Sequence, residues 1–433
     1  MSKEGFLLKG VINTDLKIID IEVSGDRISR IGKDLESSLP VVAGEGSLVL
    51  PGLVDLHTHL REPGRESSET VLSGSQAAIR GGYTALSAMA NTSPVADTAG
   101  VVEQVARLGK EAGLCDVFPI GAVTVGLRGE SLAELTAMAQ SAAAVRMFSD
   151  DGNCVSDPLL MRRALEYVKS FGGVIAQHAQ EPKLSAGGQM NEGALSSRLG
   201  LQGWPSIAEE AIIARDILMA HYVGSRLHIC HLTSKGGVEL VRWAKSQGIS
   251  VTAEVTPHHL LLTDELASTF DPVYKVNPPL RTLEDVLALR AGLADGTIDV
   301  VATDHAPHSI EDKDCDWNSA AFGMVGLETA LSVVALTMVN TGLMDWKTLV
   351  QRMSTTPALI GGYVDHGVLK VGGLANLIVV NPAARWTVDR KRLFSRSSNT
   401  PFHNLELPTV VTHTFFRGVQ VLSQGELTGL RYE

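Results

Sequence analysis

The residues with the clearest chemical potential in this chain are histidines and aspartates that end short apolar segments. His57 and His59 end the first of these segments, and His178, His231 and Asp304 end three later ones. Residues i and i+2 of a strand point to the same face, so His57 and His59 can face one site together. Imidazoles combined with a carboxylate suit Zn²⁺ best and also accommodate Mn²⁺ or Co²⁺. The pattern therefore predicts a metal centre.

A metal centre of this kind favours hydrolytic chemistry. A bound metal lowers the pKa of water from about 15.7 towards 7, which supplies metal-bound hydroxide as a nucleophile at neutral pH. A carboxylate beside the metal can hold that hydroxide, accept its proton and transfer the proton to a leaving nitrogen. Asp304 is therefore the predicted catalytic residue and proton shuttle.

Several neighbouring residues leave alternatives open. Asp150 and Asp151 end a further apolar segment, and one of them is expected to complete the metal centre. His258 and His259 follow the seventh predicted strand, where a packing or ligand-supporting role is favoured over direct coordination. The remaining histidines outside the motifs below are interpreted as structural or surface residues: His221, His228, His366, His403 and His413.

The middle of the chain alternates short β-branched segments with helix-like segments. Eight such pairs predict an α/β fold, a (β/α)8 TIM barrel, whose functional groups gather at the C-terminal ends of the strands. A doubly wound sheet is the competing architecture, but no G-x-G-x-x-G follows the first strand. Ser206 with Glu209, and Thr282 with Asp285, are predicted capping boxes. The predicted strands are 53–59, 83–89, 116–123, 144–149, 174–178, 227–231, 250–255 and 298–304, and the predicted helices are 69–80, 100–111, 131–141, 158–171, 207–222, 237–247, 283–294 and 328–340.

The two ends of the chain are β-rich and too short to build separate cores. Apolar and polar residues alternate through 17–31, and segments 376–380 and 409–415 read as strands. We expect residues 1–50 and 365–433 to form one composite small β domain. Residues 51–364 would then be the catalytic barrel.

Composition narrows the class of protein. The 433 residues are 44% hydrophobic and 20% charged, which is typical of a globular protein and excludes a disordered chain. A net charge of −11 argues against nucleic acid as a partner. Four cysteines without a C-x-x-C pair form neither a disulfide framework nor a thiolate zinc site. No signal peptide or membrane-spanning segment is recognisable, so a reduced, cytoplasmic protein without membrane association is expected.

The segment 51–59, Pro-Gly-Leu-Val-Asp-Leu-His-Thr-His, and its continuation 60–64, Leu-Arg-Glu-Pro-Gly, carry a resemblance to known enzymes. They resemble the amidohydrolase superfamily and, within it, the class I bacterial dihydroorotase family. The likeness runs from about residue 45 to 385, and the set of motifs in this order is highly specific. The other matching motifs are 90–92, 148–152, 230–233, 276–281, 302–308 and 321–328.

The resemblance implies a reaction and a zinc centre. The reaction is the reversible interconversion of N-carbamoyl-L-aspartate with L-dihydroorotate and water, in de novo pyrimidine biosynthesis. By motif matching, His57, His59 and Asp304 would hold the more buried ion, and His178 and His231 the second.

The bridge between the two ions departs from the common pattern. Many superfamily members use a carboxylated lysine on strand four, but residues 145–151 contain no lysine. Class I dihydroorotases can use an aspartate instead, and Asp151 matches that position better than Asp150. We expect two zinc ions per chain, with a single ion as the alternative because an aspartate is shorter than a carboxylated lysine.

Dihydroorotate is a small anionic ring, and its carboxylate requires a cation. Arg61 lies two residues beyond His59 and offers a bidentate guanidinium at the same mouth. Asn91, at the end of strand two, is expected to add an amide donor. Asn277, His308 and the backbone of Phe322 and Gly323 match the family's substrate contacts. The polar loop 305–317 is interpreted as exposed, with closure over the site left open.

Two other functions compete with this interpretation. A hydantoinase or allantoinase would share the metal chemistry, but a hydantoin lacks the ring carboxylate that Arg61 and Asn91 would bind. A non-catalytic, dihydroorotase-like scaffold subunit would be expected to lose metal ligands, whereas this chain keeps four histidines and Asp304. At the level of the family a homodimer is expected, and association with aspartate transcarbamoylase stays open.

Overall fold

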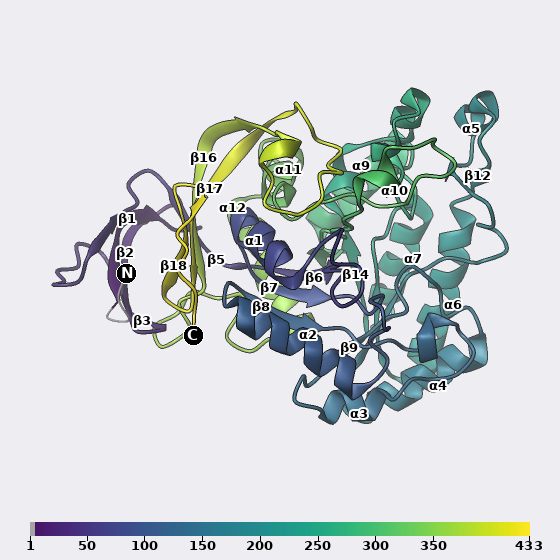
Figure 1. Cartoon of the computed structure of the whole chain (residues 1–433), viewed down its shortest axis with the longest axis horizontal. Helices are drawn as coiled ribbons and strands as arrows, with labels where there is room; N and C mark the ends of the chain where they lie inside the picture. Colours follow the sequence, from purple (N-terminus) through teal and green to yellow (C-terminus); the bar gives the residue numbers. More distant parts are fainter. Residues whose placement is uncertain (1–4) are drawn as a thin grey trace.

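A closed ring of parallel strands forms the middle of the chain in this computed structural model, which describes residues 5–433 (Figure 1). The strands form a three-stranded sheet, β6-β7-β8, and a five-stranded sheet, β15-β14-β13-β10-β9. Single parallel pairs, Gly121 with Phe148 and Thr58 with His305, join the two sheets on both sides. The predicted TIM barrel is confirmed. Its strands are β6 (Leu53–Thr58), β7 (Tyr83–Ala88), β8 (Asp116–Pro119), β9 (Met147–Phe148), β10 (Val174–Gln177), β13 (Arg226–Ile229), β14 (Val251–Val255) and β15 (Val300–Val301).

A helix follows each barrel strand. These helices are α1 (Val71–Gly81), α2 (Ala99–Ala112), α3 (Leu135–Gln140), α4 (Pro158–Lys169), α6 (Ile207–Val223), α7 (Lys235–Ser246), α9 (Leu283–Asp295) and α11 (Ala330–Val334), the last continued by the π-helical turn η4 (Ala335–Val339). Shorter elements fill the connections: α5 (Ala194–Leu199), α8 (Pro257–Leu261), α10 (Ile310–Lys313), α12 (Trp346–Val350), α13 (Thr356–Gly361), β11 (Met190–Asn191), β12 (Gly203–Trp204), η1 (Val125–Leu127), η2 (Asp264–Thr269), η3 (Pro272–Tyr274), η5 (Gln351–Thr355) and η6 (Arg390–Arg392).

Local signals in the sequence have mixed outcomes. The capping box of Thr282 and Asp285 is present at the start of α9. The predicted box of Ser206 and Glu209 is wrong, because Ser206 is already in a helical conformation and makes no side-chain cap. Glu209 instead accepts hydrogen bonds from Thr233 and Ser234, at 2.9 Å from each backbone nitrogen. The carboxylate therefore joins α6 to the loop after β13.

Both ends of the chain contribute to one sheet, which Figure 1 shows beside the barrel. In this sheet β5 pairs antiparallel with β16, from Leu377 opposite Pro51 to Val380 opposite Leu48. This pairing supports our proposal of a composite β domain from 1–50 and 365–433, whose residues 1–4 lie outside the described part of the chain. The strands run in the order β19-β18-β17-β16-β5-β1-β2-β3, with β4 beside β1; they are β1 (Phe6–Ile12), β2 (Ile18–Ser24), β3 (Arg27–Gly32), β4 (Val41–Ala43), β5 (Leu48–Pro51), β16 (Leu377–Thr387), β17 (Glu406–Phe416), β18 (Val419–Ser423) and β19 (Glu426–Leu427).

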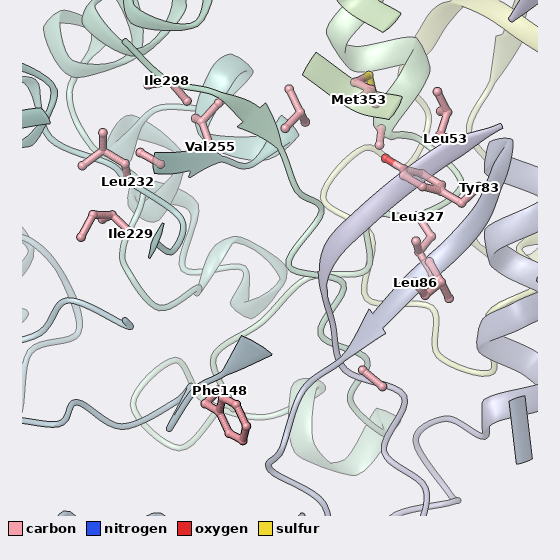
Figure 2. Packing of buried hydrophobic residues seen from close by; sticks show 14 of the residues in the cluster. Leu53, Tyr83, Leu86, Phe148, Ile229, Leu232, Val255, Ile298, Leu327 and Met353 are labelled. Carbon is pink, nitrogen blue, oxygen red and sulfur yellow. The ribbon is translucent and has the colours of Figure 1, made fainter. Parts of the chain in front are cut away.

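The largest apolar cluster lies between the barrel strands and the helices around them. Figure 2 shows part of it, including Leu86, Phe148, Val255 and Leu327, all of which are fully buried. Burial of this much apolar surface is the main stabilising contribution to such a barrel. No helix within residues 5–433 has both the length and the apolar character needed to cross a membrane.

Candidate metal centre and active site

Asp151 lies at the centre of four imidazoles at the C-terminal end of the barrel strands. Its Oδ1 is 3.2 Å from His178 Nδ1 and from His231 Nε2, and 3.3 Å from His57 Nε2. Its Oδ2 is 3.3 Å from His59 Nε2. All five side chains are buried. The structure thus gathers residues from the ends of β6, β9, β10 and β13 into one cluster.

Asp304 approaches the same cluster from the segment after β15. Its Oδ1 is 3.1 Å from His59 Nε2 and 3.5 Å from His57 Nε2. Its φ is 45°, and Arg61 and His231 also have positive φ, at 60° and 29°. Such backbone is uncommon outside glycine, and it persists only where the surrounding structure holds it. The three residues are therefore held in place by their neighbours.

Asp55 supplies part of that support. Its Oδ1 accepts hydrogen bonds from the backbone N–H of Thr303 at 3.0 Å and of His57 at 3.2 Å. Its Oδ2 accepts from the Thr58 hydroxyl at 2.9 Å. One buried carboxylate thus fixes the end of β6 relative to the residue before Asp304.

Three of the four imidazoles contact a side-chain oxygen on the side away from Asp151. Such contacts fix the orientation and tautomer of the ring, so that the nitrogen facing the cluster keeps a lone pair for a metal ion. The pairs are His57 Nδ1 with Glu254 Oε1 at 2.6 Å, His59 Nδ1 with Asn91 Oδ1 at 2.8 Å, and His178 Nε2 with Gln180 Oε1 at 2.7 Å.

Sequence reasoning missed Glu254, which is fully buried inside the barrel. Besides His57, it is 2.9 Å from His228 Nε2 and accepts from the His231 backbone N–H at 3.2 Å. A signal was present in the segment Val251–Val255, where the alternate residues belong to the apolar cluster outside the barrel. Strand periodicity then turns Glu254 inward, where a carboxylate needs a partner.

The electrostatics of the cluster favour positive charge at its centre. Burial opposes charge on His57, but Asp151, Glu254 and Asp304 outweigh it and raise the pKa of His57 well above its usual value. Burial likewise opposes charge on Asp151 and Asp304, but His57 and the other imidazoles lower both pKa values, that of Asp304 to about 2. Protons or a metal cation can supply the positive charge.

The donor set fits a metal ion. His57 Nε2 is buried and has no hydrogen-bond partner among residues 5–433, although it faces two carboxylates. A buried imidazole nitrogen that has no hydrogen-bond partner and lies near other nitrogen and oxygen donors is typical of a zinc ligand without its metal. Two groups have ligand atoms that all lie within 4.8 Å of one another: His57, His59 and Asp151, and Asp151, His178 and His231.

A third group, His57 with Cys230 and Glu254, fits a metal less well. Burial raises the pKa of the Cys230 thiol far above its usual range, so the thiol stays protonated. The His57 nitrogen on that side, Nδ1, already contacts Glu254. Of the two neighbouring aspartates, only Asp151 faces the imidazoles. Asp150 instead accepts hydrogen bonds from the backbone N–H groups of Val123 and Thr124, at 2.8 and 2.9 Å.

Arg61 is buried beside the cluster. Its Nε donates to the Pro307 carbonyl at 3.1 Å, and its other guanidinium nitrogens have no acceptor among the described residues. Burial lowers the pKa of Arg61 to about 10, so the group is cationic at neutral pH. Asn91 uses its oxygen on His59, and its NH₂ group has no acceptor within residues 5–433. Both side chains therefore retain donors for a ligand.

The other predicted substrate contacts lie on the neighbouring loops. Asn277 donates to Gln180 Oε1 at 3.3 Å, and its own buried oxygen has no donor within residues 5–433. His308 Nε2 lies 2.7 Å from the Phe322 carbonyl, and Gly323 N–H donates to Lys275 O at 3.0 Å. The Gly323 N–H is therefore already paired. The groups left for a ligand are the Phe322 N–H and the second lone pairs of the Phe322 and Gly323 carbonyl oxygens.

His258 and His259 are buried behind these loops. His259 contacts the Thr256 hydroxyl at 2.8 Å and the Pro278 carbonyl at 3.2 Å. Burial lowers the pKa of His258 to about 4 and holds that of His259 well below its usual value, so both rings are neutral. Neither belongs to the two ligand groups around Asp151.

Comparisons with known proteins match this fold and most of this sequence. A family profile described as Dihydro-orotase-like matches residues 46–237. Among solved structures, L-hydantoinase (dihydropyrimidinase) from Arthrobacter aurescens has a TM-score of 0.86 at 26% identity, covering 98% of this chain and 97% of that one. Dihydropyrimidinase from Brevibacillus agri has a TM-score of 0.84 at 20% identity, covering 99% and 97%, which shows the shared fold.

Curated relatives are much closer in sequence. A dihydroorotase from Streptomyces coelicolor is 64% identical over 411 residues, which cover 94% of this chain and 96% of that protein. A dihydroorotase from Leifsonia xyli subsp. xyli is 60% identical over 427 residues, or 98% of each chain. With identity this high over nearly the whole length, the chain belongs to the dihydroorotase family of metal-binding amidohydrolases.

Proposed function

We propose that this chain catalyses the reversible interconversion of N-carbamoyl-L-aspartate with L-dihydroorotate and water. The observation that carries the proposal is the position of Asp304, 3.1 Å from His59 Nε2 at the edge of the imidazole cluster, with the Arg61 guanidinium buried beside it. A carboxylate for proton transfer and a cation for a substrate carboxylate are thus both present. The names of the close relatives support the same reaction.

We also propose two zinc ions per chain. His57, His59 and Asp304 would hold one ion, His178 and His231 the other, and Asp151, within 3.3 Å of all four imidazoles, would lie between them. When bound, the metal acts as a Lewis acid and as an activator of water. The absence of lysine from 145–151 and the central place of Asp151 support assignment to the class I bacterial type.

In hydrolysis, ionised Asp304 accepts the proton of the attacking water and delivers it to the ring nitrogen as the C–N bond breaks. In cyclisation the same steps run in reverse: ionised Asp304 accepts a proton from the amide nitrogen of carbamoyl aspartate as that nitrogen attacks the side-chain carboxylate, and it delivers the proton to the departing oxygen. Hydrolysis creates a carboxylate and releases a proton at neutral pH, whereas cyclisation consumes one, so alkaline pH favours hydrolysis and acid favours cyclisation.

Substrate binding is assigned to side chains with unused hydrogen-bonding groups. Arg61 would bind the ring carboxylate, with Asn91 donating from its NH₂ group. Asn277, His308 and the backbone of Phe322 and Gly323 would contact the rest of the ring. Removal of the substrate carboxylate would leave the Arg61 charge buried and unpaired, which penalises hydantoin-like rings.

The direct test is a substrate panel with metal analysis. Purified protein is assayed with dihydroorotate, hydantoin and allantoin, and its zinc content is measured by elemental analysis. We expect turnover of dihydroorotate well above that of the other two. Faster hydantoin hydrolysis would favour the hydantoinase alternative. The structural similarity to L-hydantoinase is the reason to test it. A zinc-loaded protein inactive on all three would favour the scaffold alternative.

Assembly and location are further proposals, supported by membership of the family. We propose that the protein is a cytoplasmic homodimer. We also propose that it can associate with aspartate transcarbamoylase, an enzyme of the same pathway. Light scattering on the eluting protein gives its mass, to be compared with 46.1 kDa for one chain. Co-elution with purified aspartate transcarbamoylase tests the association.

A further inference from the structure

A side chain from the C-terminal part of the chain, Asn399, joins two stretches at the mouth of the barrel. Its Nδ2 donates to the Ala306 carbonyl at 3.0 Å and to the Gly323 carbonyl at 3.1 Å. Its Oδ1 accepts from the His308 backbone N–H at 3.3 Å. Asn399 is buried. The amide therefore uses both donors and its acceptor within the protein.

The two stretches that Asn399 joins contain residues proposed to contact the substrate. Ala306 and His308 lie two and four positions after Asp304, and Phe322 precedes Gly323. The same stretches contact each other through His308 Nε2 and the Phe322 carbonyl, 2.7 Å apart. We define this pair of stretches, residues 305–308 and 322–325, as the His308 wall. Asn399 lies outside the wall and bonds to both of its halves.

The segment that carries Asn399 is itself fastened to the barrel. The Arg396 backbone N–H donates to Glu69 at 3.1 Å, and the Ser397 hydroxyl donates to the Ser68 carbonyl at 2.7 Å. Glu69 is also 3.3 Å from His305 Nε2, next to Asp304. The Asn399 backbone carbonyl accepts from Val325 N–H at 3.2 Å. The amide thus acts from a fixed position.

We propose that Asn399 is a positioning residue that sets the spacing between His308 and Phe322–Gly323 for substrate binding. The proposal rests on the proposed function, because it concerns the same substrate. Asn399 itself makes no contact with Asp151, Asp304 or the imidazoles among the interactions above. Its loss should therefore change substrate binding more than the chemical step.

The amide chemistry of Asn399 permits a near-isosteric test. In Asn399→Asp the NH₂ group becomes an oxygen, which repels the Ala306 and Gly323 carbonyl oxygens instead of bonding to them. Asn381→Asp is the matched control in the same part of the chain. Among residues 5–433, Asn381 bonds through its Oδ1 alone, which accepts from Ala383 and Ala384 N–H at 3.1 Å each, so aspartate preserves both bonds.

The experiment measures kinetics, zinc content and amide hydrogen exchange for the wild type, N399D and N381D. For N399D we expect KM for dihydroorotate to rise about tenfold or more, with kcat changed less and zinc content unchanged. Peptides covering 305–308 and 322–325 should exchange faster in N399D only. Asn399→Ser, which keeps one donor and one acceptor, should give an intermediate KM, and it replaces N399D if that variant does not fold.

Three results would overturn the proposal. They are a wild-type KM in both N399D and N399S, a lower melting temperature of N399D with unchanged KM, or amide exchange in the His308 wall that is equal in N399D and the wild type. Failure of the proposed function has a different signature. A wild-type protein without dihydroorotase activity refutes the function, whereas the exchange comparison still decides whether Asn399 holds the wall.

Discussion

The proposed function gives Asp304 two roles, as a metal ligand and as a proton carrier, and its Oδ1 lies 3.1 Å from His59 Nε2 and 3.5 Å from His57 Nε2. Its carboxylate is ionised at neutral pH, with the pKa lowered to about 2 by His57 and His59 against the opposing effect of burial. Replacement by asparagine preserves the size and one oxygen ligand while removing the proton carrier. The structure therefore allows the two roles to be separated.

For Asp304→Asn we expect kcat to fall by about 10²–10⁴-fold in both directions, because general acid–base catalysis contributes about that much. Steady-state assays of hydrolysis and cyclisation measure it. Zinc content is determined on the same preparation, since the loss of a ligand would produce a similar fall. A metal-loaded variant with wild-type kcat would move the proton shuttle to another group, with His308 the next to test.

Arg61→Met removes the buried cation and keeps much of its aliphatic volume. A charge-assisted hydrogen bond contributes about 1.5–3 kcal/mol, so kcat/KM for dihydroorotate should fall at least about tenfold. Zinc content should stay at the wild-type value because Arg61 is not among the ligand groups. Wild-type kinetics in this variant would place the carboxylate-binding cation elsewhere.

At the scale of elements, a partly buried glutamate links the barrel to the segment that carries Asn399. Glu328, just before α11, accepts from the backbone N–H of Phe394 at 2.8 Å and of Ser395 at 3.1 Å. Burial raises the pKa of Glu328 from 4.5 to about 8, although these two donors oppose the rise. The native carboxyl therefore holds a proton that the unfolded chain releases above pH 4.5.

That difference gives a prediction about stability and pH. The stabilisation by protonated Glu328 is complete below about pH 4.5 and is lost as pH rises to about 8. Glu328→Gln keeps an acceptor without titrating, so its stability relative to wild type should increase between pH 5 and pH 9, by a few kcal/mol at about 1.4 kcal/mol per unit. Urea unfolding at both pH values measures it. A difference independent of pH would show that Glu328 does not titrate in this range.

Sequence patterns located the barrel elements better than they located the contacts between elements. The strands appear where β-branched segments occur, but β9 and β15 span only Met147–Phe148 and Val300–Val301. Beyond them, at Asp304, the backbone leaves the extended conformation. Local propensity cannot anticipate this departure, because Asp55, nearly 250 positions away in the chain, fixes it through Thr303.

The same limit explains what could be predicted of the candidate site. Strand-end position and residue type singled out His57, His59, His178, His231 and Asp304 as candidates. Their supporting partners had weaker signals. Glu254 required knowing which face of β14 points inward. Gln180 lies two positions after His178, but nothing in its residue type signals the contact, and Asn399 is an ordinary amide until the folded chain brings it to His308.

At the scale of the whole molecule, a metal ion would bind only the folded state, since its ligands come from five separate strand ends. Chelation should therefore abolish dihydroorotate hydrolysis and lower the melting temperature, and added Zn²⁺ should restore both in part. Calorimetry and activity assays on chelator-treated, zinc-restored and untreated protein measure the effects. Full activity in a preparation verified to be metal-free would contradict a hydrolytic metal centre.

The pairing of β5 with β16 has a consequence for how this protein is made. Leu48–Pro51 emerges from the ribosome early, and its antiparallel partner, near Leu377–Val380, emerges more than 300 residues later. At about 5–20 residues per second, the nascent β5 edge waits for tens of seconds without that neighbour. An unpaired strand edge is a site for association with other chains. Because β1 pairs with the opposite edge of β5, the growing polypeptide depends on chaperones to cover this one. A polypeptide released before residue 377 would keep that edge open permanently.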